Sequence, residues 1–133
     1  MQVEDDFTVA FWVKATKLDF AGENRAIYKE GQYNIDLLHG AGRMEIRTGG
    51  AWKGTGPGER LMLDEWHHIV ATFLKGTATY YKDGSQMGNA VGLGKIQKSN
   101  SRIQIGHMGL KSFEGVMDEL RIYNRGFKAK DAK

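Results

Sequence analysis

Apolar and polar residues alternate with a period of two along most of the chain, beginning at Phe7. Successive residues of a β-strand point to opposite faces of a sheet, so the run from 7 to 14 predicts a strand with one apolar face. Its predicted core-facing residues are Phe7, Val9, Phe11 and Val13. Trp12 falls on the opposite face, where it lies either exposed in a groove or covered by a loop.

The same alternation predicts further strands over residues 25–30, 32–39, 43–48, 66–73, 77–82, 85–91, 102–106 and 115–124. The predicted inward positions are Tyr33, Ile35, Leu37, Met44, Ile46, Ile69, Ala71, Phe73, Ile103, Ile105, Val116, Asp118, Leu120 and Ile122. Asp83-Gly84 lies between two of these strands, and this dipeptide favours a tight hairpin turn because both residues tolerate positive φ.

Two stretches lack this alternation. Residues 49–60, GGAWKGTGPGER, predict a surface loop or an irregular edge strand. The last residues could begin a short helix at Phe127, but nothing in the sequence anchors the tail from about residue 126.

The composition agrees with short strands joined by turns, since the chain has 18 glycines and one proline. Its 133 residues suffice for one domain, 1–133, with one core. Cysteine is absent, which excludes disulfides and cysteine-based metal sites. The net charge of +3 comes without a basic stripe, which argues against nucleic-acid binding. No apolar run is long enough to span a membrane.

Four blocks between residues 7 and 125 resemble one family: FTVAFWVK, WHHIVATF, TYYKDG and FEGVMDELRIYNR. In these blocks the chain resembles the laminin-G-like, concanavalin A-like lectin/glucanase jelly-roll family. The resemblance implies an all-β fold, an antiparallel β-sandwich of jelly-roll type. It also favours packing over ligand contact for Trp12, where family members usually carry an aromatic residue, and a structural place near the sandwich rim for Trp66.

The start of the chain departs from the family pattern. Family members usually have a strand before the FTVAFWV block, and MQVEDD resembles only the end of that strand. We therefore expect the first N-terminal strand to be lacking. An unpaired sheet edge invites pairing with another chain, so one expectation is a homodimer formed through an edge strand.

Asp118 is the most informative charged residue, because its parity places a carboxylate toward the core. A buried carboxylate must be hydrogen-bonded, paired or bound to a cation. The first alternative, favoured here, is that backbone N–H groups satisfy it. The second follows from the resemblance, which implies a structural calcium ion, Ca²⁺, near Asp118. The family's other calcium ligands come largely from the strand that this chain lacks.

The sequence offers little for catalysis. Glycoside hydrolysis needs two carboxylates that flank the bond, and the Glu-x-Asp-x-Glu type of strand motif found in some enzymes of this fold is absent. His67 and His68 are adjacent, so they point to opposite faces and cannot share a metal ion. We therefore predict that the domain is not an enzyme.

Carbohydrate binding requires an aromatic ring for stacking and planar polar groups that read hydroxyls. Trp52 is the candidate for stacking, and a loop anchor is its alternative role. The candidate polar partners are Arg43, Arg47, Asn34, Asp36 and His107. For Arg43 and Arg47 the favoured alternative is an ordinary solvated strand face. The predicted function is a non-catalytic recognition module for a glycan, cut from a larger secreted or cell-surface protein. The alternative is a protein-interaction or spacer domain without a glycan site.

Overall fold

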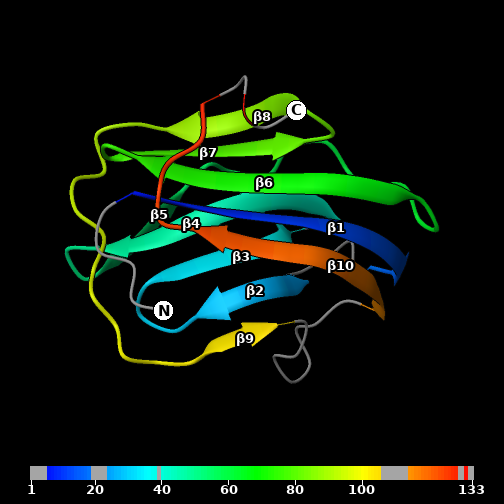
Figure 1. Ribbon diagram of the computed structural model, residues 1–133, viewed down its shortest axis with the longest axis horizontal. Helices are drawn as coiled ribbons and strands as arrows, with labels where there is room; N and C mark the ends of the chain where they lie inside the picture. Colours follow the sequence, from blue (N-terminus) through cyan, green and yellow to red (C-terminus); the bar gives the residue numbers. More distant parts are fainter. Residues whose placement is uncertain (1–5, 19–23, 39, 106–113, 129–130, 132–133) are drawn as a thin grey trace.

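The protein was analysed as a computed structural model, which describes residues 6–18, 24–38, 40–105, 114–128 and 131. Ten strands form two antiparallel sheets of five strands each, packed face to face (Figure 1). The sheet that we name the β1 sheet has the order β10 (Glu114–Tyr123), β1 (Phe7–Lys17), β6 (Trp66–Leu74), β7 (Thr77–Lys82) and β8 (Ser85–Ala90). The β4 sheet has the order β5 (Ala51–Gly54), β4 (Ala41–Thr48), β3 (Tyr33–Leu38), β2 (Arg25–Lys29) and β9 (Ile103–Ile105).

The core lies between the two sheets, and the alternation in the sequence predicted most of it. All four residues predicted to point inward from the first strand are fully buried. So are Tyr33, Ile35 and Leu37 from β3 and Met44 and Ile46 from β4. The all-β sandwich of antiparallel sheets is therefore confirmed. No helix in the part of the chain that the structure describes is long and apolar enough to cross a membrane.

The two sheets approach each other closely where β7 faces β4. Tyr80 is fully buried, and a Cβ atom added at Gly42 would overlap its ring. The glycine therefore provides the space that the tyrosine ring fills. The predicted Asp83-Gly84 turn is also confirmed, with φ of 53° at Asp83 and 83° at Gly84.

The inward parity predicted for the last strand is wrong in its first half. Asp118 is exposed rather than core-facing, and Val116 is 52% exposed, whereas Met117 packs against the core. The cause is a β-bulge, since the register with β1 shifts between Ala10 and Trp12. A bulge adds one residue to one strand and so reverses the alternation beyond it.

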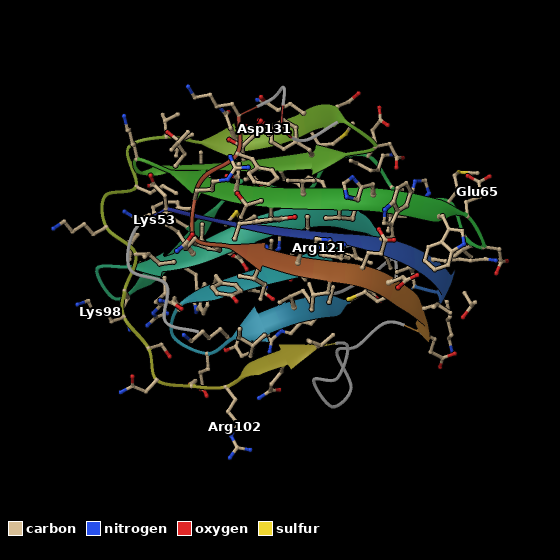
Figure 2. The ribbon with its side chains drawn as sticks, in the orientation of Figure 1. Lys53, Glu65, Lys98, Arg102, Arg121 and Asp131 are labelled. Atoms are coloured by element: carbon tan, nitrogen blue, oxygen red, sulfur yellow. The ribbon has the colours of Figure 1, made fainter. Side chains whose placement is uncertain are left out.

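The structure also refines the predictions for three segments at the edges of the sheets. Ile105 was predicted to point inward but is 52% exposed on the edge strand β9. Residues 51–54 of the glycine-rich stretch form the edge strand β5, which is the second of the two predicted alternatives. Trp66 opens β6, as expected, and is 45% exposed. In Figure 2, Lys53 and Arg102 mark the two ends of the β4 sheet, at β5 and next to β9.

The two ends of the chain were also subjects of prediction. The expected lack of a first strand concerns residues 1–5, which lie outside the described residues. For the tail we expected no anchor, but the Phe127 N–H donates to the hydroxyls of Thr8 and Thr72, both at 2.9 Å. The Phe127 ring also lies 4.8 Å from the Tyr123 ring. The tail is therefore attached to the β1 sheet at this residue.

Candidate functional site

A hollow of about 330 Å³ lies on the outer face of the β4 sheet. We name it the Trp52 hollow. Its lining combines two aromatic rings with charged and amide groups: Arg25, Tyr28, Asn34, Arg43, Glu45 and Trp52. Such a mixture of apolar rings and a few convergent polar groups is typical of small-molecule sites.

Strand register brings these residues together. Asn34 of β3 pairs with Tyr28 of β2 on one side and with Glu45 of β4 on the other. Neighbouring residues in such a row point to the same face of the sheet. Because Tyr33 and Ile35 point into the core, Asn34 and its two neighbours must point outward. The alternation that buries the core thus also builds the hollow.

Arg25 reaches the hollow through a bulge. Strict alternation would place it on the same face as Ile27, which is fully buried. The register between β2 and β3 instead shifts between Arg25 and Ile27, so that Arg25 pairs with Asp36. Its guanidinium then lies 4.5 Å above the centre of the Tyr28 ring, a favourable position for a cation over an aromatic ring.

The floor of the hollow contains a network of charged groups. Arg43 donates through Nε to Asp36 Oδ1 at 2.8 Å and through Nη2 to Asp36 Oδ2 at 3.1 Å. Its Nη2 also lies 3.2 Å from Glu45 Oε1. The side chain of Asp36 is fully buried, whereas that of Glu45 is 20% exposed. A bidentate pair of this kind fixes the guanidinium plane, so Asp36 orients Arg43 from beneath.

Asn34 is held at the centre of this network. Its Nδ2 donates to Asp36 Oδ2 at 2.9 Å and to Glu45 Oε1 at 3.3 Å. These two carboxylates fix the orientation of the amide, because the opposite orientation would place its oxygen against them. Asn34 is 3% exposed, and its Oδ1 is buried without a hydrogen-bond partner among the described residues. This oxygen has almost no accessible surface, so Asn34 supports the hollow from beneath rather than offering an acceptor to a ligand.

Aromatic rings form the wall. Trp52 of β5 and Tyr28 of β2 lie with ring centres 6.2 Å apart and planes 29° apart. The Arg47 guanidinium lies 5.7 Å from the centre of the Trp52 ring, and Arg47 pairs directly with Trp52 across the two strands. Trp52 is thus supported by a neighbouring cation while it remains partly exposed.

Of the residues predicted to bind a glycan, Trp52, Arg43 and Asn34 line the same hollow, and Arg47 lies beside Trp52. Asp36 lies beneath the hollow as the partner of Arg43, while His107 lies outside the described residues. Sequence reasoning missed three lining residues: Arg25, Tyr28 and Glu45. The outward parity of Tyr28 and Glu45 was a usable signal, but the bulge that turns Arg25 outward leaves no clear sign in the sequence.

The calcium expectation rests on Asp118, whose Oδ1 accepts the N–H of Glu119 at 2.8 Å. Calcium takes six to eight oxygen ligands. Within the described ranges no three acidic or histidine side chains are grouped so that they could hold a metal ion. The residues that the structure places around Asp118 therefore do not by themselves fit a calcium site, and the binding of calcium stays a prediction.

The whole chain, residues 1–133, matches the family model of the concanavalin A-like lectin/glucanases superfamily. The chain belongs to this superfamily. No curated protein sequence matches it.

Solved structures share this fold at low sequence identity. A heptameric SAP-like pentraxin from Limulus polyphemus is 13% identical with a TM-score of 0.74, over 99% of this chain and 70% of that one. Domain 4 of AbnA, an extracellular arabinanase from Geobacillus stearothermophilus in complex with arabinotriose, is 18% identical with a TM-score of 0.76, over 98% and 66%. A putative carbohydrate-binding protein from Bacteroides ovatus is 17% identical with a TM-score of 0.74, over 95% and 39%.

Proposed function

We propose that this superfamily member is a non-catalytic module that binds a carbohydrate in the Trp52 hollow. The observation that carries the proposal is the grouping of two partly exposed aromatic rings, Tyr28 and Trp52, with charged groups that the protein already holds in place.

The other groups of the hollow suit the two surfaces of a sugar ring. The C–H face of a pyranose or furanose ring is apolar and can stack on Trp52 or Tyr28. Each sugar hydroxyl can both donate and accept a hydrogen bond. Glu45 can accept a hydrogen bond from one hydroxyl, and Arg43 can donate one to another. Both charged groups are already held in place by the network with Asp36, so little side-chain freedom would be lost on binding.

The same network argues for binding rather than hydrolysis. Asp36 and Glu45 both accept from the Asn34 amide and both pair with Arg43. The Asp36 carboxylate is fully buried, and Arg43 contacts both of its oxygens. It therefore offers no free oxygen toward the hollow for attack on a glycosidic bond or for proton transfer.

Related structures supply the context for this proposal. One of them is described as a domain of an extracellular arabinanase bound to arabinotriose, and another as a putative carbohydrate-binding protein. The chain covers 66% of the arabinanase domain and 39% of the carbohydrate-binding protein. By analogy we propose that this module belongs to a secreted or surface protein and directs it to a glycan.

The test is retention on polysaccharides of the wild type, Trp52→Ala and Asn34→Ala, with Trp66→Ala as the matched control. Trp66 is an exposed tryptophan outside the hollow. Loss of one stacked ring removes about 1 kcal/mol, so we expect Trp52→Ala to bind roughly fivefold more weakly, while Trp66→Ala binds like the wild type. Arabinan, xylan, mannan, β-glucan and polygalacturonate are the probes.

Thermal melting of each variant separates loss of the site from loss of the fold. If no polysaccharide retains the folded wild type, the glycan proposal fails. The alternative, a protein-interaction or spacer domain, then takes its place.

A further inference from the structure

A second hollow, of about 490 Å³, lies on the opposite side of the sandwich, on the outer face of the β1 sheet. We name it the Trp12 hollow. It is lined by Trp12, His68, Asp83, Gly84 and Ser85. The sequence analysis favoured packing for Trp12, yet its side chain is 37% exposed in this hollow.

The base of the Trp12 hollow is a pair of stacked rings. Trp12 of β1 pairs with His68 of β6, and their ring centres lie 4.8 Å apart with planes 30° apart. Burial lowers the pKa of His68, and this effect outweighs the opposing influence of Asp83 and Glu119. The imidazole is therefore neutral at pH 7, and the two rings form an uncharged aromatic surface.

Hydrogen-bonding groups border these rings on two sides. The Asp83 carboxylate accepts the backbone N–H of His68 at 2.8 Å and contacts His67 Nδ1 at 2.8 Å, and its side chain remains 44% exposed. On the other side, the bulge in β10 pairs the exposed Asp118 directly with Trp12. Each carboxylate oxygen can accept more than one hydrogen bond, so both groups can still accept from a ligand.

We propose that the Trp12 hollow is a second saccharide-binding platform, which takes a neutral sugar unit. The sugar's C–H face would stack on Trp12, and its hydroxyls would donate to Asp83 and to the Ser85 hydroxyl. The one charged side chain that lines this hollow in the described structure is a carboxylate. A uronic acid would bring like charges together, so the platform selects against acidic sugars.

The two hollows differ in charge and lie on opposite sheets. The Trp52 hollow is lined by two arginines and one glutamate, whereas Asp83 lines the Trp12 hollow. A module with a site on each outer face can bind two separate glycan chains at once and link them, and this raises retention only where both sites are engaged together. This inference does not depend on the Trp52 proposal.

The three tryptophans provide a direct test. Each indole N–H gives one resonance in a ¹⁵N–¹H correlation spectrum, and Trp→Phe substitutions at positions 12, 52 and 66 assign them. The probes are arabinohexaose, xylohexaose, cellohexaose and mannohexaose, with trigalacturonate as the acidic probe. We expect at least one neutral hexaose to shift the Trp12 resonance in a saturable manner, in the wild type and in Trp52→Ala alike, while trigalacturonate leaves it in place.

Trp66 is the internal control, because it is exposed on the same sheet but does not line the hollow. A Trp12 resonance that none of the four neutral hexaoses moves overturns the inference, and so does an equal shift of Trp66. If only the Trp52 resonance moves, the first site stands and the second is rejected. If only the Trp12 resonance moves, the Trp12 hollow binds the saccharide and the Trp52 proposal is rejected.

Discussion

At the scale of single residues, Asp83 connects the turn after β7 with the start of β6. Its backbone has positive φ in the hairpin turn, and its carboxylate accepts from the His68 N–H and contacts His67 Nδ1. The other ring nitrogen of His67 accepts the Met62 N–H at 3.1 Å. His67 Nδ1 therefore carries the proton and donates to Asp83, and the chain before β6 is tied to the turn.

These bonds make the contribution of Asp83 to stability depend on pH. Burial raises the pKa of Asp83, but hydrogen bonds from His67 and from the His68 N–H, with the nearby positive charges, outweigh burial and lower it below its ordinary 3.8. A carboxyl group whose pKa is lower in the folded state stabilises the fold fully above its unfolded pKa. That contribution is lost as the pH falls from 3.8 through the folded pKa.

We therefore predict that Asp83→Asn lowers the free energy of unfolding by about 1 kcal/mol at pH 7, because solvent screens the bonds of this partly exposed carboxylate. Asparagine also tolerates positive φ, so the turn itself is kept. Urea unfolding at pH 7 and at pH 2.5 measures the effect, and the difference between variant and wild type should shrink at the lower pH. An equal difference at both pH values would show that the ionised carboxylate is not responsible.

At the scale of elements, two bulges determine what each outer face presents. The bulge in β2 turns Arg25 outward to the Trp52 hollow, and the bulge in β10 places Asp118 beside Trp12. Glu119, in the second bulge, adopts a φ of 51°, a backbone conformation that side chains other than glycine, asparagine and aspartate rarely take. In each hollow, therefore, a bulge in a strand places one polar residue, Arg25 or Asp118, next to the aromatic rings.

The close packing of β4 against β7 leads to a prediction at the same scale. A methyl group at Gly42 would overlap the Tyr80 ring, and overpacking of a core costs about 1–3 kcal/mol. We expect Gly42→Ala to lower the melting temperature by several degrees. Tyr80→Leu removes the hydroxyl and the ring carbons that the new methyl group would meet, so the double variant should recover part of the loss. If Gly42→Ala melts like the wild type, the two sheets are less tightly packed than the structure indicates.

At the scale of the whole molecule, the sandwich has four edge strands within the described ranges: β10, β8, β5 and β9. β10 is bulged and carries several exposed charges, which discourages pairing with another chain. β9 has three residues, and Ile105 on it is 52% exposed. An exposed apolar residue on an edge strand favours pairing with another chain, so β9 is the edge through which we expect association.

The predicted homodimer is therefore open to a direct measurement. We expect the mass determined by sedimentation equilibrium to rise with protein concentration, and Ile105→Lys to reduce this rise, because a charge on an edge strand opposes edge-to-edge pairing. Repeating the measurement with calcium and with EDTA tests the predicted metal ion on the same samples. A single monomer mass at every concentration would contradict the dimer.

The sequence by itself determined the features of the fold that follow directly from the alternation of apolar and polar residues and from turn residues. The period-two alternation determined the sandwich and its core, as Phe11, Ile35 and Met44 illustrate, because burial of one strand face imposes that pattern directly. The same pattern placed Asn34 and Arg43 on an outer face, whereas Trp52 lies in a stretch without alternation, 49–60. The Asp-Gly turn was readable too, since few residues tolerate positive φ.

The tertiary structure alone decided three other features: the two bulges, the pairing of each outward residue with its neighbours, and the exposure of Trp12. A bulge shifts the alternation by one residue without a fixed sequence signature, so Asp118 was misplaced and the outward position of Arg25 was not foreseen. The place of Asn34 beneath the hollow became visible only when its amide nitrogen was found to donate to Asp36 and Glu45. Alternation tells which face a residue occupies, whereas contacts across strands depend on register and on which loops cover that face.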